Sequence, residues 1–236
     1  NLKGVLGDDV AVLASRLETR RYAALLGATT EFVKAEGIAF DAEENRLMLA
    51  VTRSDGLSTS EKPDSVRQDH LQYPSNYCGL ILSGPLNQGV SDTVGQPILS
   101  SHVLTSFSTL VAGIEVLEDG REMCDTQGIA NPDNIAFMAG QNKLLISEDS
   151  GRHVLNRLWS YDMASGALTA LQLSPLAGEM SGAQWFQNIG NFDYIGSSIQ
   201  HPFRFAKDDP NWVEATDEDR ASYMGFIGPF PTNGHQ

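Results

Sequence analysis

Two acidic residues occupy equivalent places in two copies of one short pattern, where their carboxylates could hold a hard metal cation. Residues 133–149, DNIAFMAGQNKLLISED, repeat residues 36–52, EGIAFDAEENRLMLAVT, without a gap and at a constant offset of 97 residues. Glu36 and Asp133 head the two copies, and Asn134 follows the second acid. Hard metal cations prefer carboxylate and amide oxygens, so Glu36, Asp133 and Asn134 are candidate metal ligands. Asn-Pro-Asp-Asn is also an ordinary turn sequence, and a purely structural role stays open.

Three further charged residues lie at the ends of these copies or just outside them. Glu148 and Asp149 close the second copy, and since adjacent strand residues point to opposite faces, at most one of them faces a given site. A solvated strand end is the alternative. Lys34 stands two residues before Glu36, so in an extended chain both side chains lie on the same side. An ammonium there suits a phosphate pocket, although a surface ion pair is the commoner reason for such spacing.

The elements that must position these residues are mostly strands. Each copy reads as an apolar strand, a polar turn and a second apolar strand, which is typical of a β-hairpin. The pattern predicts four hairpins, over residues 37–51, 134–147, 157–173 and 182–198. Residues 8–26 have helical apolar spacing and predict one N-terminal helix, while 53–76 predict a long loop. Residues 206–236, rich in Pro, Gly and acids, predict an extended acidic tail.

The repeat length suggests an architecture. The 97-residue offset is about twice the ~45–50 residues of a propeller blade. We therefore expect an all-β, propeller-like domain over residues 1–205, with about two to three blades. Propellers usually need at least about four blades to close, so the missing blades would come from an upstream segment or from another chain.

Composition narrows the classes of partner. Sixteen basic residues against thirty acidic ones give a formal charge of −14, which repels nucleic acid and makes cations the natural partners. No apolar run approaches the ~20 residues of a membrane helix. The chain starts at Asn1, from which we expect a processed product or part of a longer polypeptide. The motifs of serine hydrolases, P-loop enzymes and HExxH metalloproteases are absent from the sequence.

Several segments resemble the C-terminal part of PhoX-type alkaline phosphatases, over about residues 20–203. They are RRYAALLGATTEFVKAEGIAFD (20–41), NYCGLI (76–81), CDTQGIANPDNIAF (124–137), LLISEDSGRH (144–153), LWSYDMASGALT (158–169) and IQHPF (199–203). The resemblance implies an exported six-bladed propeller with a calcium and iron cluster in its central channel, which hydrolyses phosphate monoesters. The upstream half of such proteins, with a cysteine ligand to iron, has no counterpart in this chain.

The resemblance also assigns roles to particular residues. It implies that Glu36 and Asp133 are metal ligands, with Asn134 and Glu148 as additions. Lys34 falls where many members carry a phosphate-contacting arginine in an Arg-Pro-Glu triplet, here Lys-Ala-Glu, which keeps the charge and loses the bidentate fork.

Relatives of this type also imply a disulfide between Cys78 and Cys124, the two cysteines of the chain. Two non-catalytic roles remain as alternatives to the phosphatase. The chain could be a propeller-like subunit docked in a larger assembly, or a propeller that calcium only stabilises.

Overall fold

The computed structural model describes residues 10–29, 31–32, 34–55, 71–92, 94–116, 122–205, 207–208 and 212–232. Two compact units are present. The first consists of Asn1–Phe32 and Asp55–Ser75, and the second of Val33–Ser54 and Asn76–Gln236. The predicted loop over 53–76 lies largely outside the described residues.

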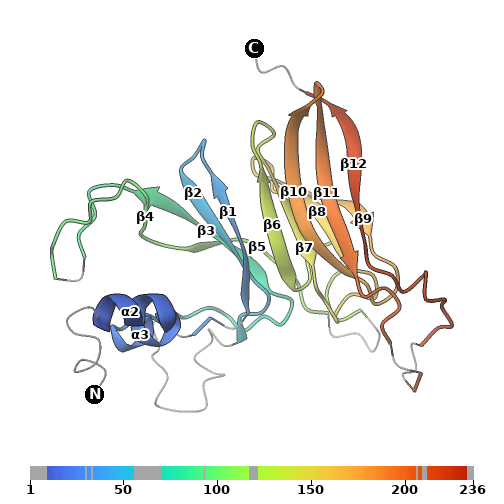
Figure 1. Ribbon diagram of the computed structural model, residues 1–236, viewed down its shortest axis with the longest axis horizontal. Coiled ribbons are helices and arrows are strands. Elements are labelled where there is room, and N and C mark those ends of the chain that lie inside the picture. The colour runs from blue at the N-terminus through green and yellow to red at the C-terminus, as the bar shows by residue number, and fades with distance from the viewer. Residues whose placement is uncertain are drawn as a thin grey trace. The chain divides into compact units, whose positions relative to one another are not determined.

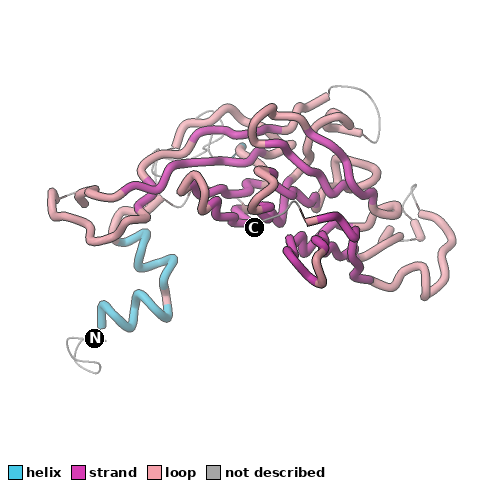
Figure 2. Tube along the Cα trace, turned by 90° about the horizontal axis from the view of Figure 1, so that it is seen from above, coloured by secondary structure: helices cyan, strands magenta, loops and turns pink. Residues whose placement is uncertain are grey.

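The first unit carries two short helices where one was predicted over residues 8–26. They are α2 (Val10–Leu17) and α3 (Thr19–Leu25), drawn in cyan in Figure 2. The helix is interrupted at Glu18, whose φ of −133° and ψ of 42° are not helical. The hydroxyl of Thr19 donates to the carbonyl oxygen of Ser15 at 2.5 Å, a type of bond that bends helices. No residue of either helix is buried; among the residues with helical apolar spacing, Leu17 and Leu25 are exposed and the others are half-buried.

The second unit is built from three antiparallel sheets (Figure 1). The first sheet contains β1 (Ala35–Asp41), β2 (Arg46–Val51), β3 (Leu80–Asn87), β4 (Val103–Leu104) and β5 (Ser108–Ala112). The middle sheet contains β6 (Pro132–Met138), β7 (Lys143–Glu148), β8 (Arg157–Asp162) and β9 (Leu168–Leu173). The third contains β10 (Glu179–Ile189), β11 (Phe192–Gln200) and β12 (Tyr223–Pro231). The prediction of a mostly β protein is therefore confirmed.

All four segments predicted as hairpins lie in antiparallel pairs of consecutive strands: β1–β2, β6–β7, β8–β9 and β10–β11. The repeated asparagines of the first two turns have a local reason. Asn45 and Asn142 adopt φ values of 47° and 48°, in the left-handed region that asparagine tolerates better than most residues. The shared turn geometry explains why both copies keep an asparagine at this place.

The C-terminal segment differs from the prediction. Residues 206–236 were expected to form an extended tail, but Tyr223–Pro231 is a strand that pairs along β11. The register joins Ile195 to Ile227 and Ile199 to Tyr223. Within β12 only Ile227 is partly buried, against the core of the middle and third sheets, so the long-range backbone pairing with β11 rather than a local apolar pattern defines this strand.

The middle sheet is covered on both faces. Leu144 and Ile146 of β7 belong to a core shared with the first sheet, whereas the intervening Leu145 belongs to a core shared with the third sheet. This alternation follows from the two-residue period of a strand. Consequently β6 lies beside β1 on one side and β10 on the other (Figure 1).

Hydrogen bonds also join the turn ends of the three sheets. The backbone N–H of Gly140 donates to Glu43 Oε1 at 2.8 Å, and Gln187 Nε2 donates to the carbonyl oxygen of Ala139 at 2.7 Å. Glu43 and Gly140 are themselves equivalent positions of the repeat. Within the described part of the chain, no helix is long and apolar enough to span a membrane.

Candidate functional site

The acids that head the two repeated hairpins lie on neighbouring strands. Gly37, next to Glu36 in β1, is packed so tightly that a Cβ there would lie 2.6 Å from the carbonyl oxygen of Asp133 and 2.7 Å from the N of Ile135. Only glycine permits this approach of β1 to β6. Glu36 is exposed and Asp133 is half-buried. The packing therefore brings the two predicted carboxylate positions to one rim of the sheets.

Burial and three neighbouring charged groups shift the pKa of Asp133. Burial and, to a smaller extent, the negative charges of Glu36 and Asp149 together raise the pKa of Asp133 from its usual 3.8 to about 6, and the positive charge of Lys34 partly offsets this increase. Three acids and one cation thus interact at this rim. A proton on Asp133 relieves the repulsion, and a hard cation among these oxygens would relieve it as well.

A second cation, which the sequence patterns did not indicate, approaches this rim. Arg204 forms an ion pair with Glu179 at the start of β10, and its Nη2 lies 4.0 Å from Asp149 Oδ1. His201 and Phe203, just before it, adopt positive φ values of 52° and 55°. Such backbone strain in residues other than glycine often marks functional segments. The only nearby sequence feature that could have drawn attention to Arg204 is the IQHPF run, which it directly follows.

Asn134 links two sheets in this structure. Its Oδ1 accepts hydrogen bonds from Ser181 Oγ at 3.0 Å and from the N–H of Gly182 at 2.8 Å, both in β10. Its carbonyl oxygen accepts a bond from Ser147 Oγ at 2.8 Å. The amide oxygen is therefore occupied in joining β6 to β10, and the ligand role of Asn134 stays a prediction.

Glu148 is fully buried and bound by four protein groups. Its Oε1 accepts bonds from Trp159 Nε1 at 2.6 Å and from the N–H of Ala130 at 2.9 Å. Its Oε2 accepts a bond from the N–H of Arg157 at 2.9 Å and contacts His153 Nδ1 at 3.0 Å. A buried carboxylate needs such donors, and these contacts favour a structural role, so the ligand role of Glu148 also stays a prediction.

His153 completes this network and was not singled out from the sequence. It is buried, and its second nitrogen, Nε2, contacts the carbonyl oxygen of Asp125 at 3.2 Å. The imidazole thereby ties the end of β7 to the segment that carries Cys124. No local motif indicated this role, because Asp125 lies 28 residues before His153 in the chain.

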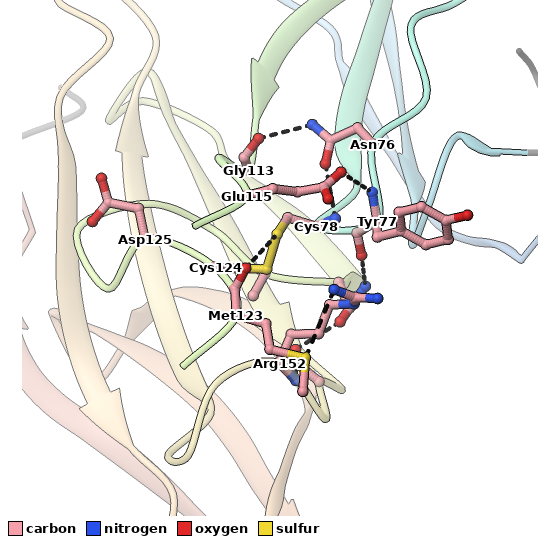
Figure 3. The surroundings of a disulfide bond; sticks show 12 residues. Asn76, Tyr77, Cys78, Gly113, Glu115, Met123, Cys124, Asp125 and Arg152 are labelled. Atoms are coloured by element: carbon pink, nitrogen blue, oxygen red, sulfur yellow. Dashed lines mark hydrogen bonds between the residues drawn. A yellow bond between two sulfur atoms is a disulfide. The ribbon is translucent and has the colours of Figure 1, made fainter. Parts of the chain in front are cut away.

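Cys78 and Cys124 form a disulfide, with their Cα atoms 6.0 Å apart, as the resemblance implied (Figure 3). Both half-cystines are buried. The neighbouring backbone is held by side chains: Asn76 Nδ2 donates to the carbonyl oxygen of Gly113, and the N–H of Tyr77 donates to Glu115 Oε1. A disulfide at this place is consistent with an oxidising compartment.

The donor set fits a hard cation only in part. Glu36, Asp133 and Asp149 offer carboxylate oxygens of the kind that calcium takes. Among the described residues, however, no group of three His, Cys, Asp or Glu side chains is placed to hold a metal ion. Both cysteines are in the disulfide, so they offer no thiolate to iron. Comparison with family models, curated proteins and solved structures finds no match to this chain.

Proposed function

We propose that this chain is the C-terminal portion of a PhoX-like, calcium- and iron-dependent phosphomonoesterase. The observation that supports the proposal most is the meeting of Lys34, Glu36 and Asp133 at one rim, where the charges of Lys34 and Glu36 act on Asp133. Acids that repel one another at a half-buried position favour a bound cation, and a cation beside them favours a phosphate.

In this proposal the three sheets are blades of a six-bladed propeller. The first strands of the three sheets lie next to one another: β1 neighbours β6, and β6 neighbours β10. The outer faces of the first and third sheets carry exposed apolar side chains: Ile38 is 63% exposed and Phe226 64%. These faces would receive the remaining blades, from the upstream half of the same protein or from another chain.

The proposal gives each residue at the rim its own role. Glu36 and Asp133 would hold calcium, and the bound metal would polarise the phosphoryl group and activate a water or oxo nucleophile. Lys34 balances the charge of the bound phosphate, and Arg204 offers a second cation at the same rim. Iron would be held mostly by residues outside this chain. The disulfide supports the further proposal that the protein is exported to the periplasm, the extracellular space or an organelle lumen.

The enzymatic proposal is tested with the polypeptide that joins this chain to its missing blades. We expect release of p-nitrophenol from p-nitrophenyl phosphate, lost on chelation and restored by calcium. Lys34→Met should raise KM for the phosphate ester about tenfold, as expected for loss of a charged contact, whereas Lys207→Met should leave it unchanged. An inert parent polypeptide with calcium and iron supplied would contradict the proposal.

A non-catalytic subunit, docked in a larger assembly, is the second candidate. It is favoured by the exposed apolar outer faces, which include Met224 at 76% exposure, and by the incomplete metal group of the described residues. It predicts tight assembly with partner sheets and no hydrolysis. If calcium raises the melting temperature of that assembly without hydrolysis, the ion has a structural role only.

A further inference from the structure

A second hollow lies at the other end of the sheets from the acidic rim. A cleft of about 310 Å³ is bordered by the β6–β7 turn end of the middle sheet and by β10–β12 of the third sheet. Met138, Leu171 and Phe230 give it an apolar wall, while Lys143, Ser160 and Trp185 add polar groups. Asp133 lies at the opposite end of β6 from Met138, so this cleft is separate from the site described above.

Two donors at the cleft lack acceptors in the described structure. The indole Nε1 of Trp185 is buried and has no hydrogen-bond partner among the described residues. Lys143 forms no ion pair with any described acid. Asp162 is its register partner across β7–β8 and feels the Lys143 charge, which helps to lower the pKa of Asp162, but its Oδ1 accepts hydrogen bonds from Ala164 and Ser165 of its own turn. A buried N–H without an acceptor is costly, and a ligand that supplies the acceptor removes this cost.

The first sheet has a hollow at the equivalent place of the repeat. A cleft of about 330 Å³ there is lined by Arg46 and Ser83, the equivalents of Lys143 and Ser160 in the repeat. The Nε of Arg46 is likewise buried without an acceptor. Its Nη2, however, pairs with the buried Asp41 at 2.7 Å, so the charge of Arg46 is compensated. The cleft at Lys143 differs in two ways: its cation forms no ion pair with a described acid, and Trp185 and Phe230 of the third sheet contribute to its lining.

We propose that the cleft at Lys143 and Trp185 binds a small molecule that joins an apolar ring to one anionic, hydrogen-bond-accepting group, as aryl carboxylates do. The ring lies against Met138, Leu171 and Phe230. The carboxylate accepts a hydrogen bond from Trp185 Nε1 and lies beside the Lys143 ammonium, a charge-assisted arrangement. The cleft is of the size that small ligands occupy, with few polar groups that fix orientation. This proposal does not depend on the phosphatase proposal.

The test follows the indole N–H signals of the whole chain, labelled with ¹⁵N-tryptophan, during titration with phenylacetate. The Trp185 signal should move downfield, with a dissociation constant on the order of 1 mM for a ligand of this size. The Trp159 signal should stay, because its Nε1 already donates to Glu148 at 2.6 Å. The cation 2-phenylethylammonium has the same ring and should leave Trp185 unmoved.

Two substitutions test separately what the Lys143 charge and the Trp185 indole contribute to phenylacetate binding. Lys143→Met should weaken phenylacetate binding about threefold to fivefold, while Lys207→Met, the same change at a cation that lies over Trp212, should not. Trp185→Phe assigns the signal and should also weaken binding. The proposal is overturned if Trp185 does not respond up to about 20 mM phenylacetate, if the ammonium compound shifts it equally, or if Lys143→Met binds as well as the unmodified chain.

Discussion

Replacing Asp133 by asparagine should stabilise the chain at alkaline pH when no divalent cation is present. Asparagine resembles the protonated carboxyl, which the fold prefers because burial, Glu36 and Asp149 raise the pKa of Asp133 to about 6. The folded state therefore keeps this proton between about pH 4 and 6, where the unfolded chain has lost it. Asp133 therefore contributes most to folding stability below its unfolded pKa of 3.8, and this contribution is lost as the pH rises through about 6.

The size of this effect follows from the two pKa values. Their difference corresponds to about 3 kcal/mol. Asp133 is only half-buried, so solvent screening reduces the expected gain to about 1 to 2 kcal/mol. Urea denaturation in EDTA should show Asp133→Asn more stable by this amount at pH 8, and equal to the unmodified chain near pH 4. Calcium at pH 8 should stabilise the unmodified chain and leave the variant almost unchanged.

A matched aspartate provides the control. Hydrogen bonds from the backbone and hydroxyl of Ser165 lower the pKa of Asp162, which is the opposite direction to the shift of Asp133. Asp162→Asn should therefore reduce stability at pH 8. The reasoning is refuted if Asp133→Asn is neutral or destabilising at pH 8 without divalent cations, or if its effect does not change between pH 4 and pH 8.

Three further substitutions test the packing. Gly37→Ala should lower the free energy of unfolding in urea by about 2 kcal/mol, because the added Cβ would clash with the β6 backbone. Gly225→Ala, which has open space around it, should change it little. Equal effects of the two variants would argue against close β1–β6 packing. Glu148→Gln should lower the free energy of unfolding by about 3 kcal/mol, because an amide NH₂ group would replace one carboxylate oxygen and face hydrogen-bond donors. An unchanged stability would show that this network contributes little. Removing the Cys78–Cys124 disulfide, which joins residues 46 apart, should cost up to about 4 kcal/mol at equilibrium; an unchanged denaturation midpoint would contradict this.

Local patterns predicted the hairpins because each is encoded within about fifteen residues by alternating strands and a turn residue. The left-handed φ of Asn45 and Asn142 was seen only in the structure. The same reasoning missed β12, since its partner β11 lies more than 20 residues away and the intervening segment has no period. It also predicted one helix where Glu18 divides two, because apolar spacing carries no information on that break.

The candidate site was predictable to a similar degree. The repeat placed Glu36 and Asp133 at equivalent positions, and strand packing then made them neighbours. The partners of Glu148 could not be foreseen, because Ala130, His153 and Trp159 converge only in the folded sheets. Arg204 was missed for the same reason, since its acids lie on β10 and at the end of β7.

The neighbourhood of Glu36 and Asp133 can be measured directly by a ¹³C NMR titration of the Asp133 carboxyl, in the unmodified chain and in Glu36→Gln, both in EDTA. We expect an apparent pKa of about 6 for Asp133 in the unmodified chain and a lower value in the variant, because Glu36 contributes to the increase. An Asp133 pKa at the usual 3.8, or one that does not respond to Glu36→Gln, would contradict the proposed shared rim.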